Sequence, residues 1–287
     1  MSCMAAHAFQ IPGSDGVPIR GDLHVPAGAG PFPVVVGIHG FKGFRNWGFW
    51  PHIASGLAAR GIACVRFDSS QNGVGEGGLD FDEKDLFERN TWAREEHDLR
   101  AVVAAVRAVS LPGGASLDPA RLGLVGHSRG GGGAVVFAAG DPGVRAVSVL
   151  APIATIDRFP AAVVADARRN GFLPILNTRT GETLRVGLDA LDEIERRTDL
   201  HDIAASYAAR MTQPLLVTAG TADTSVSPSE GARIAAAVPD PPGARFVAIE
   251  GADHVLGCRH PWAGATPEFS DWLARTADFF DEHLRPA

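Results

Sequence analysis

A serine lies in the segment G-H-S-R-G, where Gly126 and Gly130 stand two positions to either side of Ser128. Residues 121–126 before it have the apolar pattern of a buried strand, and the residues after it are typical of a helix. A sharp strand-to-helix turn exposes its central side chain and needs glycine where its two limbs would collide. The segment therefore predicts a nucleophilic Ser128, with the Arg129 backbone N–H at the helix N-terminus as an oxyanion donor. A glycine-rich junction with an incidental serine is the alternative.

A serine hydroxyl is a poor nucleophile until a base takes its proton. Of the ten histidines, His254 is the best candidate, because it directly follows the apolar strand-like residues 244–251. His260 is the second candidate, a few residues farther from the strand end. His127 is next to the serine in sequence, but its side chain is expected to point away from the hydroxyl.

The histidine in turn needs a carboxylate that fixes its tautomer and stabilises its charged form. Asp223, in GTADTSVSP, follows the strand-like residues 213–220 and is the expected partner. Asp253 and Asp157 are the alternatives. The order serine, aspartate, histidine along the chain, each just past the end of a strand, predicts a catalytic triad at one edge of a sheet.

A second oxyanion donor is expected from the loop after an earlier strand. The segment GIHGF ends an apolar run at residues 32–40, so the Phe41 backbone N–H is the expected donor, with Gly40 allowing close approach. A plain flexible turn is the alternative. Five aromatic residues lie in or beside this loop and are expected either to wall an acyl or aryl pocket or to pack in the core: Phe41, Phe44, Trp47, Phe49 and Trp50.

These residues need a scaffold in which strands alternate with helices. Such alternation predicts one α/β domain over residues 1–287, a largely parallel sheet with helices on both faces. An opening hairpin is expected around GSDG. Further strands are expected at 32–40, 62–68, 121–126, 144–152, 213–220 and 244–251. Helices are expected at 47–61, 92–109 and 267–284 and just after the serine. Residues 69–90 are expected to form a connection that is first rich in glycine and then acidic.

Residues 153–212 are far longer than a usual crossover between strands. The segment contains two helix-like stretches, and we expect it to form a small inserted cap over the sheet edge. Its arginines, such as Arg168, Arg169 and Arg179, are expected either to meet an acidic substrate or to lie on a solvated helix face.

The composition excludes several functions. A net charge of −7 and the lack of a basic block argue against binding to nucleic acid or to an anionic membrane surface. No apolar run approaches the roughly 18 residues of a membrane span, so we expect no stable membrane insertion. An odd count of three cysteines and an N-terminus without a signal-peptide pattern favour the cytoplasm. Oligomeric state is left open.

No cofactor or metal is expected. The sequence GVGEGG at 73–78 matches a dinucleotide motif, but an acidic stretch follows it and would repel a pyrophosphate. The residues Asp253, His254, Cys258 and His260 do not have the spacing of a recognised zinc site.

The HGF loop, the GHSRGG turn, the GTADTSVSP acid loop and the GADH base loop occur in the order found in α/β-hydrolases, and the chain resembles that superfamily over nearly its whole length. The turn is similar to that of dienelactone-hydrolase-like and serine-peptidase-like esterases. The resemblance implies an eight-stranded, mostly parallel sheet with one antiparallel strand near the start. Two features depart from particular branches: dienelactone hydrolases use cysteine where this chain has serine, and the loop is H-G-F where hormone-sensitive-lipase-like esterases have H-G-G-G.

Together these patterns predict a serine hydrolase that cleaves a small-molecule carboxylic ester through an acyl-enzyme, with Ser128, Asp223 and His254 as the triad. Peptidase or thioesterase activity is an alternative with the same chemistry. A non-catalytic binding protein with this fold is the alternative from another class.

Overall fold

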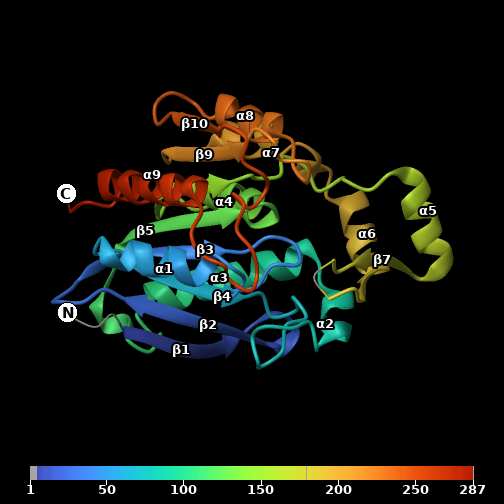
Figure 1. Ribbon diagram of the computed structural model, residues 1–287, viewed down its shortest axis with the longest axis horizontal. Helices are drawn as coiled ribbons and strands as arrows, with labels where there is room; N and C mark the ends of the chain where they lie inside the picture. The colour runs from blue at the N-terminus through green and yellow to red at the C-terminus, as the bar shows by residue number, and fades with distance from the viewer. Residues whose placement is uncertain (1–4, 179, 287) are drawn as a thin grey trace.

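The computed structural model describes residues 5–178 and 180–286, and its centre is an eight-stranded sheet with the order β1-β2-β4-β3-β5-β6-β9-β10 (Figure 1). The strands are β1 (Ala5–Pro12), β2 (Pro18–Val25), β3 (Phe32–Ile38), β4 (Ala63–Asp68), β5 (Leu117–His127), β6 (Val144–Leu150), β9 (Leu215–Gly220) and β10 (Ala244–Ile249).

Pairing in this sheet is mostly parallel. The strand β2 runs antiparallel to both of its neighbours, β1 and β4, and every other pair in the sheet is parallel. The sheet is therefore the one implied by the resemblance to α/β-hydrolases, and the prediction of this fold class is confirmed. Because the parallel strands share one direction, the loops that follow them meet at one edge of the sheet.

Helices cover both faces of the sheet. On one face, α1 (Trp50–Ala59) and α9 (Pro267–His283) bury large side chains such as Trp50, Ile53, Trp272 and Phe280. On the other face, α3 (Trp92–Arg107), α4 (Arg129–Ala139) and α8 (Pro228–Ala237) enclose a second apolar core. These two cores hold the strands rigidly, and so fix the positions of the loops at their ends.

Most of the residues between β6 and β9 lie beyond one end of the sheet (Figure 1). They contain α5 (Ala161–Asn170), the antiparallel pair β7 (Phe172–Leu176) and β8 (Thr183–Gly187), and α6 (Leu188–Arg196). The short α7 (Ile203–Ser206) instead packs against α8, and Ile203 belongs to the apolar core next to the sheet. A third apolar cluster joins this segment to the chain around α2 (Lys84–Arg89), with Phe81 and Phe87 packed near Leu173, Val186 and Leu191.

The helices α2, α7 and α8 and the β7–β8 hairpin were not predicted from the sequence. The helix α2 has six residues in a stretch dominated by glycine and acidic residues, so it gives little periodic signal. The hairpin lies in a segment where helix-like patterns on both sides dominate. In contrast, the expected helix-like stretches at 159–172 and 187–197 do contain helices, at Ala161–Asn170 and Leu188–Arg196.

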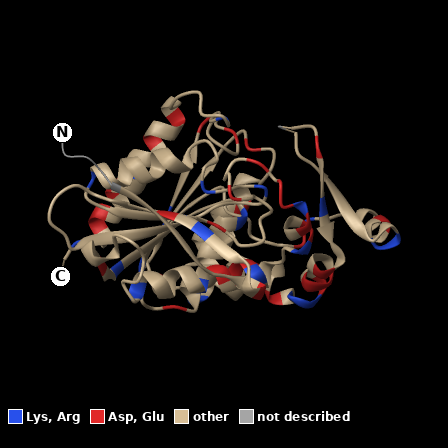
Figure 2. Cartoon of the chain, turned by 90° about the horizontal axis from the view of Figure 1, so that it is seen from below, with Lys and Arg blue, Asp and Glu red and all other residues tan. Residues whose placement is uncertain are grey.

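Charges of both signs are interleaved on the outer surface, including the α5–α6 region (Figure 2). There Arg168 contacts Asp192 and Glu195, and Arg169 pairs with Asp166, so these two arginines lie on solvated helix faces. Arg179 lies outside the described residues. Across residues 5–178 and 180–286, none of the helices is both long and apolar enough for a membrane crossing.

Candidate active site

Ser128 occupies the sharp turn between β5 and α4. Its backbone has φ 56° and ψ −120°, a region that residues with a side chain rarely adopt. A Cβ at Gly126 would lie 2.4 Å from the Gly130 carbonyl oxygen, and a Cβ at Gly130 would lie 2.3 Å from the oxygens of Ile38 and His39. Gly126 therefore permits the turn, as the G-x-S-x-G pattern predicts, whereas Gly130 allows the start of α4 to lie against the end of β3.

His254 and Asp223 form a hydrogen-bonded pair next to this turn. His254 Nδ1 donates to Asp223 Oδ2 at 2.7 Å, and the Asp223 carboxylate is fully buried. The other oxygen, Asp223 Oδ1, accepts from the backbone N–H groups of Ser225 at 2.8 Å and Val226 at 3.0 Å. With Nδ1–H committed to the aspartate, His254 Nε2 is left as the proton acceptor.

The bonds to Asp223 favour its charged form. Burial opposes ionisation, but the hydrogen bonds from His254, Val226 and Ser225 outweigh it and lower the pKa of Asp223 below its usual value. An aspartate that stays ionised can hold one histidine tautomer and stabilise the imidazolium.

The alternative residues are engaged elsewhere. His260 Nδ1 accepts from the Gly48 backbone N–H at 3.0 Å, and its ring packs edge-on against Phe44. Asp253 is exposed and accepts from two backbone N–H groups of its own loop. Asp157 is exposed, beyond the end of β6. Of the acids considered, Asp223 is the one bonded to His254.

His127 supports the loop that carries His254. Its Nε2 donates to the His254 carbonyl oxygen at 3.0 Å, and the two imidazole rings are 4.7 Å apart. Burial, together with repulsion from His254, lowers the pKa of His127 to about 3. A neutral His127 therefore holds the His254 backbone without adding charge beside the pair.

The loop after β3 lies directly against the serine. A Cβ at Gly40 would be 2.9 Å from Ser128 Cβ, so glycine is needed for this approach. Within the described part of the chain, neither the Phe41 nor the Arg129 backbone N–H has a hydrogen-bond acceptor, and Ser128 Oγ makes no hydrogen bond. Two unsatisfied donors beside the same hydroxyl are the arrangement that an oxyanion site needs.

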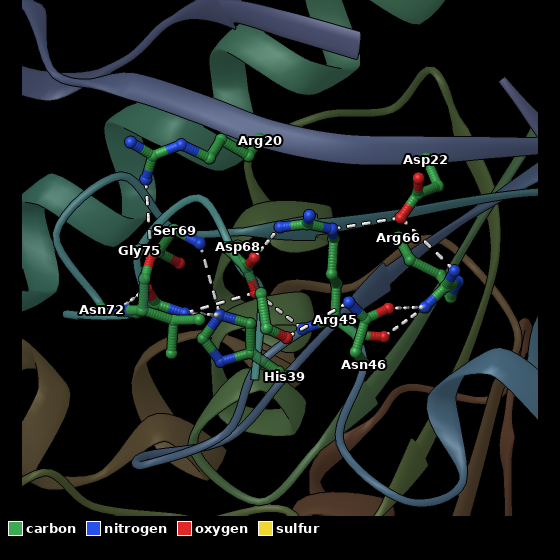
Figure 3. A network of polar contacts seen from close by, with 12 residues as sticks. Arg20, Asp22, His39, Arg45, Asn46, Arg66, Asp68, Ser69, Asn72 and Gly75 are labelled. Atoms are coloured by element: carbon green, nitrogen blue, oxygen red, sulfur yellow. Dashed lines mark hydrogen bonds and ion pairs between the residues drawn. The ribbon is translucent and has the colours of Figure 1, made fainter. Parts of the chain in front are cut away.

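A buried polar network holds this loop from behind (Figure 3). His39 Nδ1 donates to the Gly40 carbonyl at 2.9 Å, and its Nε2 accepts from the Ser69 backbone N–H at 3.3 Å. Asp68, which is 2% exposed, accepts from the Arg45 backbone N–H at 2.7 Å and forms an ion pair with the Arg45 guanidinium. Arg45, Asp68 and Ser69 were not predicted from the sequence; the alternating charges of RGDLHV and VRFD, which face each other across β2 and β4, are the signal that was available.

Arg66 extends the same network. Its guanidinium donates to the Arg45 carbonyl oxygen, to Asn46 Oδ1 at 3.1 Å and to Asp22 Oδ2 at 3.3 Å. Since buried polar groups are costly unless paired, this set of bonds fixes the course of residues 39–46.

Two chambers open on either side of the serine, and Ser128, His254, Phe41, Lys42 and Ser225 line both. The first, which we call the α6 chamber, has a volume of about 470 Å³. Its walls are largely apolar and come from α2, α3, the loop after β6, β8 and α6, and include Phe87, Trp92, Ile153, Phe159, Val186 and Ile194.

The second, which we call the aromatic chamber, has a volume of about 540 Å³. The residues Phe44, Trp47, Trp50 and Phe81 contribute to its walls, together with His260. Of the five aromatic residues expected near the oxyanion loop, Phe41, Phe44, Trp47 and Trp50 line a chamber, and Phe49 is fully buried in the core.

Comparisons with known proteins assign the chain to a family. The model of the alpha/beta hydrolase family matches residues 35–276, and the chain belongs to that family. A curated relative, Esterase FrsA of Citrobacter koseri, is 29% identical over 194 residues, which are 63% of this chain and 41% of FrsA. The chain thus matches less than half the length of this relative.

Solved structures share the fold at low sequence identity. The esterase domain of a Rhodothermus marinus protein has a TM-score of 0.66 at 21% identity, covering 98% of this chain and all of that one. Est1E of Butyrivibrio proteoclasticus with ferulic acid bound has a TM-score of 0.70 at 20% identity, with 96% and 99% covered. A dienelactone hydrolase from Anabaena variabilis has a TM-score of 0.62 at 20% identity, with 98% and 99% covered. The family and the esterase-named relative support hydrolase activity.

Proposed function

We propose that this protein is a serine hydrolase that cleaves carboxylic esters through an acyl-enzyme. The observation that carries the proposal is the 2.7 Å bond between His254 and the buried Asp223, in a site that also holds Ser128 on its strained turn. A surface histidine or a loop aspartate is common, but a buried aspartate that fixes a histidine beside a partly exposed serine is a costly arrangement that fits acyl transfer.

In the proposed reaction, Ser128 Oγ attacks the ester carbonyl while His254 Nε2 takes its proton. The Phe41 and Arg129 backbone N–H groups bind the oxyanion, and the N-terminal end of α4 adds a favourable dipole. His254 then returns the proton to the leaving alcohol. Water hydrolyses the acyl-enzyme with His254 as the base again, and Asp223 stabilises the imidazolium in both halves. The residues named here need no metal or cofactor for these steps.

We also propose that residues 153–212 act as a cap within a single hydrolase domain. Ile153, Phe159, Val186 and Ile194 from this segment line the α6 chamber. A mainly apolar chamber of about 470 Å³ fits the hydrocarbon part of a small ester. The cap thereby sets which acyl or alcohol groups enter.

Ester hydrolysis is favoured over the alternatives by the relatives, because FrsA and Est1E are named as esterases. A puromycin-hydrolysing peptidase of Mycobacterium tuberculosis also shares the fold, with a TM-score of 0.66 at 19% identity and coverage of 98% of this chain and 39% of that one. Peptide bond cleavage is therefore the second candidate. A cytoplasmic location stays a prediction.

The test is hydrolysis of p-nitrophenyl acyl esters of graded chain length by the wild-type protein and by Ser128→Ala. Turnover that depends on Ser128 and falls with acyl chains too long for the α6 chamber is expected. Equal turnover by both proteins would defeat the proposal. Parallel aminoacyl-amide and thioester substrates distinguish peptidase and thioesterase activity, and no turnover of any of them would favour a binding protein.

A further inference from the structure

The two chambers differ in charge. In the α6 chamber, Arg129 pairs with Glu95 at 2.6 Å, Arg158 pairs with Glu230 at 2.8 Å, and Glu193 accepts from the N-terminal N–H groups of α3. The aromatic chamber is lined by two cationic residues, Arg259 and Lys42, of which Lys42 also lines the α6 chamber, and no aspartate or glutamate is among its described lining residues.

Lys42 is a half-buried ammonium group without a neutralising partner. Its Nζ donates to the Leu176 carbonyl oxygen at 3.1 Å, and no carboxylate of the described chain lies within 4.0 Å of it. Burial lowers the pKa of Lys42 below its usual value, because no acidic neighbour compensates for the lost water. An anion next to this group would replace that missing partner.

The backbone conformation of Lys42 is also energetically unfavourable for a lysine. The Gly43 N–H donates to the Gly40 carbonyl at 2.9 Å, which closes a tight turn, and Lys42 has φ 57° within it. Glycine or asparagine fits this conformation more easily. The turn places Lys42 directly after Phe41, so its side chain is anchored one residue from the proposed oxyanion donor. Strained backbone of this kind is concentrated at functional sites.

Arg259 lies in the loop after β10, five residues beyond His254 in the sequence. It is exposed, and it forms no ion pair with any described carboxylate. A Cβ at Gly48 would lie 2.7 Å from the Arg259 carbonyl oxygen, so the backbone at Arg259 packs closely against the loop that follows β3. Two cationic residues from separate loops therefore line one aromatic-walled chamber that Ser128 also lines.

We propose that the aromatic chamber binds an anionic portion of the ester substrate, a carboxylate carried on an aryl or short acyl group, through Lys42 and Arg259. This rests on the proposed function and names its substrate class. The aromatic walls pack against the carbon skeleton, and the two cations bind the carboxylate. Arg168 and Arg169, two of the arginines of the cap, are paired on the surface and take no part.

Two matched substrate pairs test the proposal. On the leaving-group side, 4-acetoxybenzoate is compared with the neutral, nearly isosteric 4-acetoxybenzamide. On the acyl side, the p-nitrophenyl monoester of adipic acid is compared with p-nitrophenyl hexanoate. Each kcat/KM is divided by the uncatalysed rate of the same ester, which removes differences in intrinsic reactivity. A preference of about tenfold or more for the anionic member of at least one pair is expected, since a hydrogen bond to a charged group contributes this much.

Three variants assign the preference to the chamber. Lys42→Gln and Arg259→Gln are each expected to lower the anionic-to-neutral ratio severalfold, mainly through KM. Lys42→Gly removes the ammonium group from a turn that favours glycine. A lower anionic-to-neutral ratio in this variant therefore reports the loss of the charge and not a disturbed fold. Arg145→Gln, an exposed cation at the start of β6, is the matched control and is expected to leave the ratio unchanged.

Turnover of neutral esters that depends on Ser128, with no preference for either anionic ester, would overturn this inference and leave the proposed function intact. A preference that survives in both Lys42→Gln and Arg259→Gln would overturn it as well. No turnover of any ester would remove the proposed function and the inference together.

Discussion

Replacing Asp223 by asparagine removes one charge from the site and leaves its shape nearly unchanged. The Asp223 Oδ1 atom accepts from two backbone N–H groups, at 2.8 and 3.0 Å, and an amide oxygen would keep both bonds. The amide NH₂ then faces His254 Nδ1, where the carboxylate oxygen lay at 2.7 Å. Two donors would meet unless His254 moves its proton to Nε2, and that tautomer cannot accept the serine proton.

The expected loss follows from this tautomer change. To regain the active tautomer, the amide must flip and give up both backbone bonds while their N–H groups stay buried. An exchange of this kind in a serine triad lowers kcat by about 10⁴-fold, which corresponds to about 5.5 kcal/mol of transition-state stabilisation. Asp223→Asn is therefore expected to lower kcat on p-nitrophenyl butyrate by about 10³- to 10⁴-fold at pH 8.

The neighbouring acid gives a closely matched control. Asp253 also accepts from two backbone N–H groups through Oδ1, at 3.0 and 2.7 Å, but it has no bond to His254. Asp253→Asn is expected to keep kcat within about threefold of wild type, because these surface bonds are preserved. Urea unfolding of both variants checks that the fold persists. An Asp223→Asn enzyme within tenfold of wild type, or an equal loss in Asp253→Asn, would refute the reasoning.

Three further perturbations follow from the same geometry. Ser128→Gly is expected to have a free energy of unfolding about 1 kcal/mol higher than that of Ser128→Ala, because glycine relieves the positive φ of the turn. Urea unfolding measures the difference, and equal midpoints would count against strain at this turn. The pKa of His127 falls to about 3 on folding, so below pH 6.5 the unfolded state binds more protons than the folded state. The free energy of unfolding therefore decreases as the pH falls, by up to about 2 kcal/mol at pH 5. Urea unfolding of His127→Gln should therefore show a smaller loss than wild type between pH 7.5 and 5. Arg45→Met leaves the Asp68 carboxylate buried without its cation, and thermal unfolding should report a loss of about 3–5 kcal/mol.

The sequence predicted the sheet and the four active-site loops because each has a short-range signal. Buried strands are apolar runs, the turn at Ser128 needs glycine two positions away on each side, and Asp223 and His254 directly follow strand ends. The fold class is confirmed by the strand order and by the family match. The roles of Phe41 and Arg129 as oxyanion donors, and the triad itself, stay predictions that the geometry supports.

Other features depend on contacts between distant segments and could not be predicted. The pairing of Arg45 with Asp68 joins the loop after β3 to the end of β4, and only the folded sheet brings these two segments together. The charge difference between the chambers is also a tertiary property, since Lys42 and Arg259 are far apart in the chain. The bond from His127 to the His254 carbonyl is another case, because the sequence predicts only that the His127 side chain points away from the serine hydroxyl.

The central claim is that Ser128 is a nucleophile activated by His254. The most direct measurement is covalent labelling of the folded protein with a fluorophosphonate, followed by peptide mass spectrometry. We expect one adduct, on the serine of the peptide containing GHSRGG, and labelling at least 100-fold slower in His254→Ala. An unlabelled Ser128, or labelling at the same rate without His254, would contradict the account.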